Sequence, residues 1–295
     1  MQISLLASTP DIAATGYMVN LLLGMPGLLA AEARALGYDG IEFFPGPPGT
    51  VGVAEMDRAL KASDVVLTAV NSGRIVAEGL TLLHPEAAIR SRALTRLKDL
   101  LDFAGHFGVP VTLAGTKGSL PSSLSAESGA TLAAEIFSGL ARFAAEAGSA
   151  LLLAPTDEAD SNFICTVADA VAWVRRINDP AFGLMLDTHQ LHRKEASVIE
   201  GVRAAAGYVR HLHLYDPGRV PPGPGGKASL DWPAILATLR DTCGRRGRVE
   251  RAAVRKCCRA AVRIRGLTAA PQYCSTAALQ NALYGVRDGR SHGRH

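Results

Sequence analysis

The chain has 295 residues, of which 48% are hydrophobic and 20% charged, so it can bury a large core and is not a disordered protein. Its five cysteines are odd in number and include no C-x-x-C pair, which argues against a disulfide framework and a structural zinc site. The net charge of +4 is unevenly distributed, because residues 1–242 carry a net −6 and residues 243–295 a net +10.

From the N-terminus to about residue 242, one pattern recurs: a segment with helical periodicity, a glycine and a short apolar run. A glycine suits a helix C-terminus, where a left-handed residue ends the helix and turns the chain into the next strand. Seven strands are predicted: ISLLA near residue 3, VVLTAV near residue 65, and the apolar runs that end the segments 35–44, 106–115, 146–155, 180–187 and 205–215.

Helices that alternate with strands predict a parallel sheet, and seven strands approach the eight of a (β/α)₈ TIM barrel. A doubly wound open sheet is the alternative, although no G-x-G-x-x-G follows the first strand. We therefore predict an α/β TIM barrel over residues 1–242. The C-terminal ends of barrel strands form the active site. Polar side chains follow the predicted strands at Glu42, Asn71, Lys117, Asp187, His213 and Arg219.

The segment RHLHLYDPGR (210–219) alternates with a period of two, which places His211 and His213 on one face of a strand. Two inward histidines are either core residues with hydrogen-bond partners or functional groups, and the pattern leaves both open. Asp187 ends the preceding strand. A carboxylate and an imidazole at adjacent strand ends form half of a divalent-metal site, so we predict Asp187 and His213 as metal ligands.

Other candidates carry weaker signals. Glu42, between Ile41 and Phe43, is expected to point inward, either to substrate or an arginine or into an internal ion pair. Arg219 lies in a loop rich in Gly and Pro and could hold a sugar oxygen or a phosphate, or be solvated. Lys117 stands between small loop residues, which favours a solvated side chain. For the remaining histidines near Asp187, a surface position is expected for one or both of His189 and His192.

These segments resemble the xylose isomerase-like TIM barrels of the sugar phosphate isomerase/epimerase superfamily, especially proteins similar to hydroxypyruvate isomerase and D-tagatose 3-epimerase. The resemblance is carried by GYDGIEFF, SNFICTVADAVAWVRRINDPAFGLMLDT, and HLHLYDPGR followed by LDWPAILATLR. It implies a small sugar or hydroxy-keto substrate and a divalent metal, manganese, magnesium or cobalt, that polarises the substrate oxygens. The implied reaction is aldose–ketose isomerisation or keto-sugar epimerisation through an enediolate.

The resemblance also implies roles for single residues. Asp187 and His213 match two of four metal ligands, Arg219 matches a substrate-binding arginine, Asp160 falls where a substrate-contacting acid is expected, and Gln190 falls where a histidine is expected. Together with Glu42, inferred above from its inward position, Asp160, Gln190 and Arg219 are the predicted substrate-binding residues. The other two ligands are glutamates that also move the substrate proton. One falls on Ala154, and the other, expected to end an eighth strand after Thr242, is not found.

No catalytic acid or base can therefore be assigned from the sequence, which predicts weak or no metal binding and no turnover. The alternative is a non-catalytic barrel that binds a sugar or regulates a partner, and Ala154 favours it because this change precedes the altered tail. Abasic-site DNA cleavage is a third reading. It needs a richer cluster of His, Asp and Glu than this chain offers.

Residues 243–295 form a basic tail rich in Cys and Arg, in which the eighth strand is expected to be lost or altered. A frameshift in a G+C-rich gene explains this composition. The rival is a genuine basic helix that binds nucleic acid or an acidic partner. We favour the frameshift, so nucleic acid is not an expected partner. No secretory or membrane segment is recognised, so a cytoplasmic protein without a membrane partner is expected, and homo-oligomerisation is left open.

Overall fold

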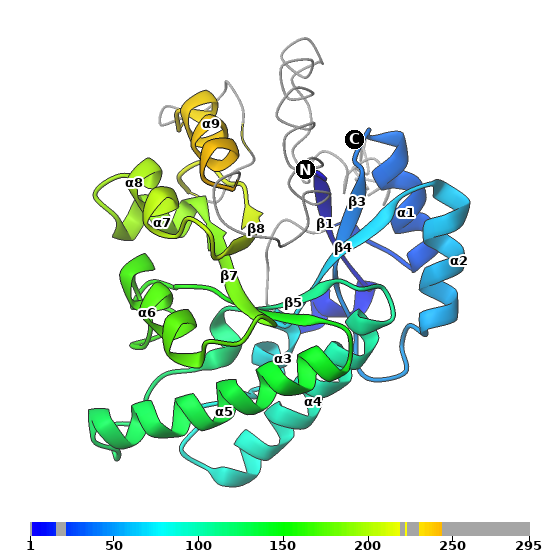
Figure 1. The fold of residues 1–295 in the computed structure, drawn as a ribbon. Coiled ribbons are helices and arrows are strands. Elements are labelled where there is room, and N and C mark those ends of the chain that lie inside the picture. The colour runs from blue at the N-terminus through cyan, green and yellow to red at the C-terminus, as the bar shows by residue number, and fades with distance from the viewer. Residues whose placement is uncertain (1, 16–21, 219–221, 223–229, 244–295) are drawn as a thin grey trace, which may run out of the picture.

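The computed structural model describes residues 2–15, 22–218, 222 and 230–243. One parallel sheet runs through them in the order β2-β1-β3-β4-β5-β6-β7-β8. The strands curl into a partial barrel with the helices around its outside (Figure 1). The strands are β1 (Ser4–Ser8), β2 (Leu22–Leu23), β3 (Gly40–Phe44), β4 (Val66–Asn71), β5 (Pro110–Leu113), β6 (Ala150–Leu153), β7 (Phe182–Asp187) and β8 (Val209–His213).

Helices follow the strands along the chain, as the fold class requires. The described α-helices are α1 (Pro26–Ala35), α2 (Val53–Ser63), α3 (Gly73–Ala77), α4 (Ala87–Gly105), α5 (Ala126–Glu146), α6 (Val167–Ile177), α7 (Thr188–Lys194), α8 (Val198–Ala204) and α9 (Trp232–Cys243). Two 3₁₀ turns, η1 (Pro10–Thr15) and η2 (Gly115–Lys117), complete the set. None of the described helices is long and apolar enough to cross a membrane.

The predicted TIM-barrel class is confirmed, and the seven predicted strands correspond to β1 and to β3 through β8. The described sheet also has an eighth strand that the sequence did not predict. This strand, β2, is only two residues long, too short for a periodic pattern, and it pairs with β1 on the side away from β3. The strand expected after Thr242 lies outside the described residues.

The predicted glycine junctions are correct at four positions and wrong at one. The backbone at Asn178, not at a glycine, adopts the left-handed conformation (φ 49°) that ends α6. Gly183 lies inside β7 instead, where a Cβ atom would come within 2.9 Å of Nε of Arg210. The four correct junctions have positive φ at Gly37, Gly108, Gly148 and Gly207.

Helix α6 illustrates how local sequence sets an element. It begins with a capping box in which the Thr166 side chain accepts from the backbone of Asp169, and the Asp169 side chain accepts from the backbone of Thr166. Its buried side chains include Val167, Ala170 and Val174, at the helical spacing that places them on one face. This face packs onto the sheet beneath.

The interior of the barrel is separate from the core between the sheet and the helices. Leu152, Ala154 and Met185 form a small buried cluster of their own, with Ala114 packed against it. Strand β6, and β7 as far as Leu186, are apolar because parallel strands in a barrel are covered on both faces. The polar residues that could carry chemistry therefore come from β3 and β8 and from the ends of β4 and β7.

Candidate functional site

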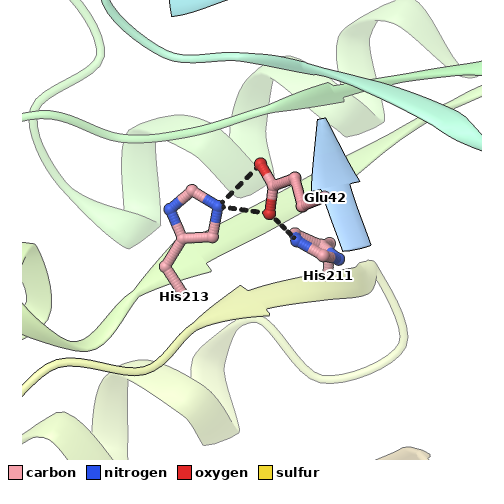
Figure 2. Close-up of side chains that lie close together, drawn as sticks. All are labelled: Glu42, His211 and His213. Carbon is pink, nitrogen blue, oxygen red and sulfur yellow. Dashed lines mark hydrogen bonds and ion pairs between the residues drawn. The ribbon is translucent and has the colours of Figure 1, made fainter. Parts of the chain in front are cut away.

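A buried carboxylate stands at the centre of the candidate site. Glu42 of β3 is 2% exposed and accepts a hydrogen bond of 2.7 Å from Nδ2 of Asn71, at the end of β4. Nε2 of His211 lies 2.7 Å from its Oε2, and Nε2 of His213 lies 3.0 and 2.9 Å from Oε1 and Oε2 (Figure 2). The sequence left open whether Glu42 contacts substrate or an arginine or forms an internal ion pair. The structure shows an internal ion pair, and its partners are His211 and His213.

The two histidines reach Glu42 from β8, which lies far from β3 in the strand order. Curling of the sheet brings them together across the barrel interior. The predicted alternation is confirmed, because His211 and His213 share a face while Leu212 packs against the main core. Strand pairing places His213 directly opposite Asp187 of β7, with Nδ1 of the ring 3.7 Å from Oδ2 of the carboxylate.

Burial and charge act against each other in this cluster. Burial alone would raise the pKa of Glu42, but the charges of His213 and His211 outweigh it and hold that pKa well below its usual range. Burial would likewise lower the pKa of His213, yet the charge of Glu42 and the hydrogen bonds to Asp187 and Glu42 raise it to about 10. The cluster is thus a tightly coupled charged group inside the barrel.

Asp187 has two tasks because β7 passes directly into α7. Its Oδ1 caps the helix by accepting from the backbone N–H groups of His189 (2.8 Å) and Gln190 (3.2 Å). Its Oδ2 is the atom that faces His213. The abrupt change from an apolar strand to polar residues therefore occurs where Asp187 both caps α7 and contributes a carboxylate to the candidate site.

The donor set fits a divalent metal ion. Glu42, His211 and His213 each offer a ligand atom within 4.8 Å of the others. The carboxylate of Asp187 offers an alternative pair with Nδ1 of His213, on the side of the ring opposite Glu42. Imidazole nitrogens and carboxylate oxygens together suit a divalent transition-metal ion. A ligating histidine usually binds a carboxylate through its second nitrogen, as His213 binds Glu42.

Two predicted substrate residues lie together next to Asp187. Gln190 of α7 is buried, and its Nε2 donates to Oδ2 of Asp160 (3.1 Å) while its Oε1 accepts from the backbone N–H of Asp157 (3.1 Å). Ion pairs of Asp157 with Arg193 and of Glu158 with Lys194 tie the same loop to α7. The structure thus brings the loop after β6 up to the side of the barrel where Asp187 lies.

The remaining predictions have mixed outcomes. Arg219 lies outside the described residues. A surface position is found for His192, which is exposed, whereas His189 is half-buried and its Nδ1 accepts from the backbone N–H of Gly218 (3.3 Å). Asn71 was noted only as a polar residue after a strand. Its role as the third partner of Glu42 could not be read from the sequence.

The expectation of a solvated Lys117 is wrong. This side chain is completely buried, and Nζ donates to Oγ1 of Thr156 at 2.6 Å and to the carbonyl of Ala114 at 3.4 Å. The backbone N–H of Leu83 donates to the carbonyl of Lys117, so the segment before α4 lies against it. Burial lowers the pKa of Lys117 from its ordinary 10.5 to about 8. The sequence did contain a signal for burial, because Lys117 lies in the short turn that follows β5, but the small flanking residues were given more weight.

Comparison with known proteins adds independent information. A family model described as xylose isomerase-like TIM barrel matches residues 30–243. The D-psicose 3-epimerase of Enterocloster bolteae is 27% identical over 219 residues, 71% of each chain. The L-ribulose 3-epimerase of Methylomonas sp. is 26% identical over 213 residues, 72% of each chain. The 3-keto-D-glucoside 4-epimerase of E. coli shares the fold with a TM-score of 0.67 at 16% identity, over 88% of this chain and 97% of that one.

Proposed function

This chain belongs to the family of xylose isomerase-like TIM barrels, and we propose that it is a divalent-metal-dependent epimerase of a small keto sugar. The matched relatives named psicose and ribulose 3-epimerase support a ketose as the substrate and the carbon next to its carbonyl as the reacting centre. Aldose–ketose isomerisation is the other reaction that the sequence resemblance implies, and the names of these relatives favour epimerisation over it.

The buried cluster formed by β3, β8 and the end of β7 is the observation that carries this proposal. Oδ2 of Asp187 and Nδ1 of His213, 3.7 Å apart, would hold the ion. Glu42, bound to the other nitrogen of His213, would fix the ring so that Nδ1 faces Asp187. A divalent ion held there would polarise the carbonyl and the adjacent hydroxyl of the ketose. His211, hydrogen-bonded to Oε2 of Glu42, would hold this carboxylate in place.

Asp160 and Gln190 are proposed to bind substrate hydroxyls beside this centre. Their hydrogen bond, and that of Gln190 to Asp187, support the idea that a sugar contacting one of them is oriented relative to the ion. The role of Arg219 as a substrate-binding arginine stays a prediction. Epimerisation also needs a group that removes a carbon-bound proton, and Ala154 cannot be that group.

Two measurements test the proposal. Calorimetric titration with Mn²⁺ should show micromolar binding that is lost in Asp187→Asn and kept in His192→Ala, a matched change at an exposed histidine. Proton NMR of D-psicose in D₂O with the manganese-loaded protein should show deuterium at C3 and the appearance of D-fructose. If the wild-type chain binds no manganese and incorporates no deuterium, the proposal is wrong and the sequence-based prediction of weak or no binding holds.

The second candidate is a barrel that binds a sugar without converting it. Ala154 favours it, because a methyl group stands where the family resemblance expects a proton-transfer carboxylate. In that case D-psicose should raise the melting temperature of the manganese-loaded protein, while no deuterium enters the sugar. Deuterium incorporation above the rate of manganese alone would exclude this candidate.

A further inference from the structure

Lys117 joins the C-terminal ends of two neighbouring strands in the barrel. It follows β5 through the turn η2, and its Nζ reaches over to Thr156, three residues after the end of β6. Both acceptors within hydrogen-bond distance, the Thr156 hydroxyl and the Ala114 carbonyl, are uncharged. Enclosing an ammonium group among neutral partners costs stability, so a structural role alone does not account for this lysine.

The amine lies close to the residues around Ala154, the position where the family resemblance expects a glutamate. Nζ lies 3.4 Å from the carbonyl of Ala114, a residue that packs against the interior cluster containing Ala154. Ala154 belongs to the interior cluster that also contains Leu152 and Met185, so this face of β6 and β7 points into the barrel. Thr156 comes two residues after Ala154, and Asp187 comes two residues after Met185. Thr156, the partner of Nζ, lies in the loop that follows β6. The same loop reaches the proposed metal ligand, because Asp160 accepts from the side chain of Gln190, whose backbone N–H donates to Asp187.

Resting on the proposed function, we propose that Lys117 is the proton-transfer residue of this site and serves where the strand-end glutamate is absent. Its neutral amine accepts the proton from the ketose carbon next to the carbonyl. The C–H bond breaks, an N–H bond forms, and the electron pair passes into the enediolate. Water supplies the proton to the opposite face of that carbon, which yields the epimer, and the ammonium group returns its proton to solvent.

The electrostatic surroundings suit this task. Burial lowers the pKa of Lys117 to about 8, which gives a neutral fraction near physiological pH. The ionisable groups whose charges act on Nζ are Cys165 and Asp160, both in the segment between β6 and α6, and both oppose the effect of burial. Asp160 is also a proposed substrate residue, so the amine and the substrate contacts share one neighbourhood.

Deuterium exchange at C3 of D-psicose in D₂O tests this inference with the full-length, manganese-loaded chain. The wild-type rate should rise through about pH 8 and then level off. Lys117→Met, nearly equal in volume, should lose roughly a hundredfold or more of the rate, the usual contribution of a general base, while its manganese affinity is unchanged. Lys61→Met, at a highly exposed lysine, is the matched control and should keep the wild-type rate.

Chemical rescue separates proton transfer from a structural role. Lys117→Ala leaves space for a small amine, so added methylamine should restore part of the exchange, and more so at higher pH. If wild type exchanges and Lys117→Met is equally fast, the inference is wrong while the proposed epimerase stands. If Lys117→Ala is inactive and no amine restores it, the role is structural. If the wild type itself exchanges no deuterium, the proposed function is wrong and the inference fails with it.

Discussion

The side chain of Lys117 is completely buried and can carry a charge. The free-energy cost of burying that charge should therefore lower the stability of the folded chain. The pKa of Lys117 is about 8 in the folded protein, against an ordinary 10.5. Between these values the unfolded chain binds more protons, so wild-type stability rises with pH across this window, and the full cost of the charge is present below about pH 8. The difference in pKa corresponds to about 3 kcal/mol.

Lys117→Met removes this titration. We expect the variant to gain stability relative to wild type at pH 7, and this advantage to shrink by about 3 kcal/mol as the pH is raised to about 10.5. Urea unfolding at pH 7, 9 and 10.5 measures it. Lys61→Met, at an exposed lysine paired with Asp57, should follow wild type at every pH and so corrects for other groups that titrate in alkali. A constant difference between Lys117→Met and wild type would contradict the lowered pKa.

At the same scale, the sequence predicts which side chains point inward but not which of them meet. From their places in the predicted strands, Glu42 and His213 could both be expected to point inward. Their contact spans 171 residues of sequence and depends on how far the sheet curls, which no local pattern encodes. The prediction for Lys117 was wrong for a related reason. Small flanking residues usually indicate an exposed side chain, but here they allow neighbouring segments to pack over the lysine side chain.

At the scale of elements, the junction of β7 and α7 couples the fold to the proposed metal site. Asp187→Asn keeps an oxygen that can cap the helix but loses the negative charge, whereas Asp187→Ala loses both. We expect neither variant to bind manganese. The alanine variant should also be less stable than the asparagine variant by about 1 kcal/mol, the usual value of an N-cap.

Urea unfolding without metal, combined with manganese titration, checks this division of tasks. His192→Ala, at an exposed position on the same helix, is the control for small changes in helix propensity. Equal stability of the two Asp187 variants would show that the cap contributes little. Retained manganese binding in Asp187→Asn would point instead to Glu42, His211 and His213 as the ligand set.

Strands with a long apolar run were predicted correctly from the sequence, whereas a very short strand and one unusual helix end were not. Strands β6 and β7 are buried on both faces, so their apolar runs identified them. Strand β2 has two residues and gave no pattern. The glycine rule failed at Gly183 because Asn178 already ends α6 in the left-handed conformation, and the glycine serves the close approach of Arg210. The local sequence pattern thus predicts the repeated helix–strand unit, but not the short strand β2 or the helix that ends at Asn178.

At the scale of the whole molecule, the described strands form a sheet whose two ends are β2 and β8. A closed barrel needs a further strand between β8 and the β1 side, because unpaired backbone groups at a sheet edge are costly and invite association. The sequence resemblance places that strand, with its terminal glutamate, directly after Thr242. The chain instead changes there from an acidic body of net −6 to a basic region of net +10.

We infer that a shifted reading frame caused this change, and this hypothesis predicts what the gene contains. We expect codons 235–295, translated in all three forward frames, to give in another frame an apolar strand that ends in Glu after Thr242. A chain built with that frame should close the barrel and bury more surface. Both its midpoint and its m-value in urea should therefore exceed those of the present chain. The added glutamate should also tighten manganese binding. If no frame encodes such a strand, the basic region is native, and a salt-dependent affinity of the full chain for DNA becomes the expected result.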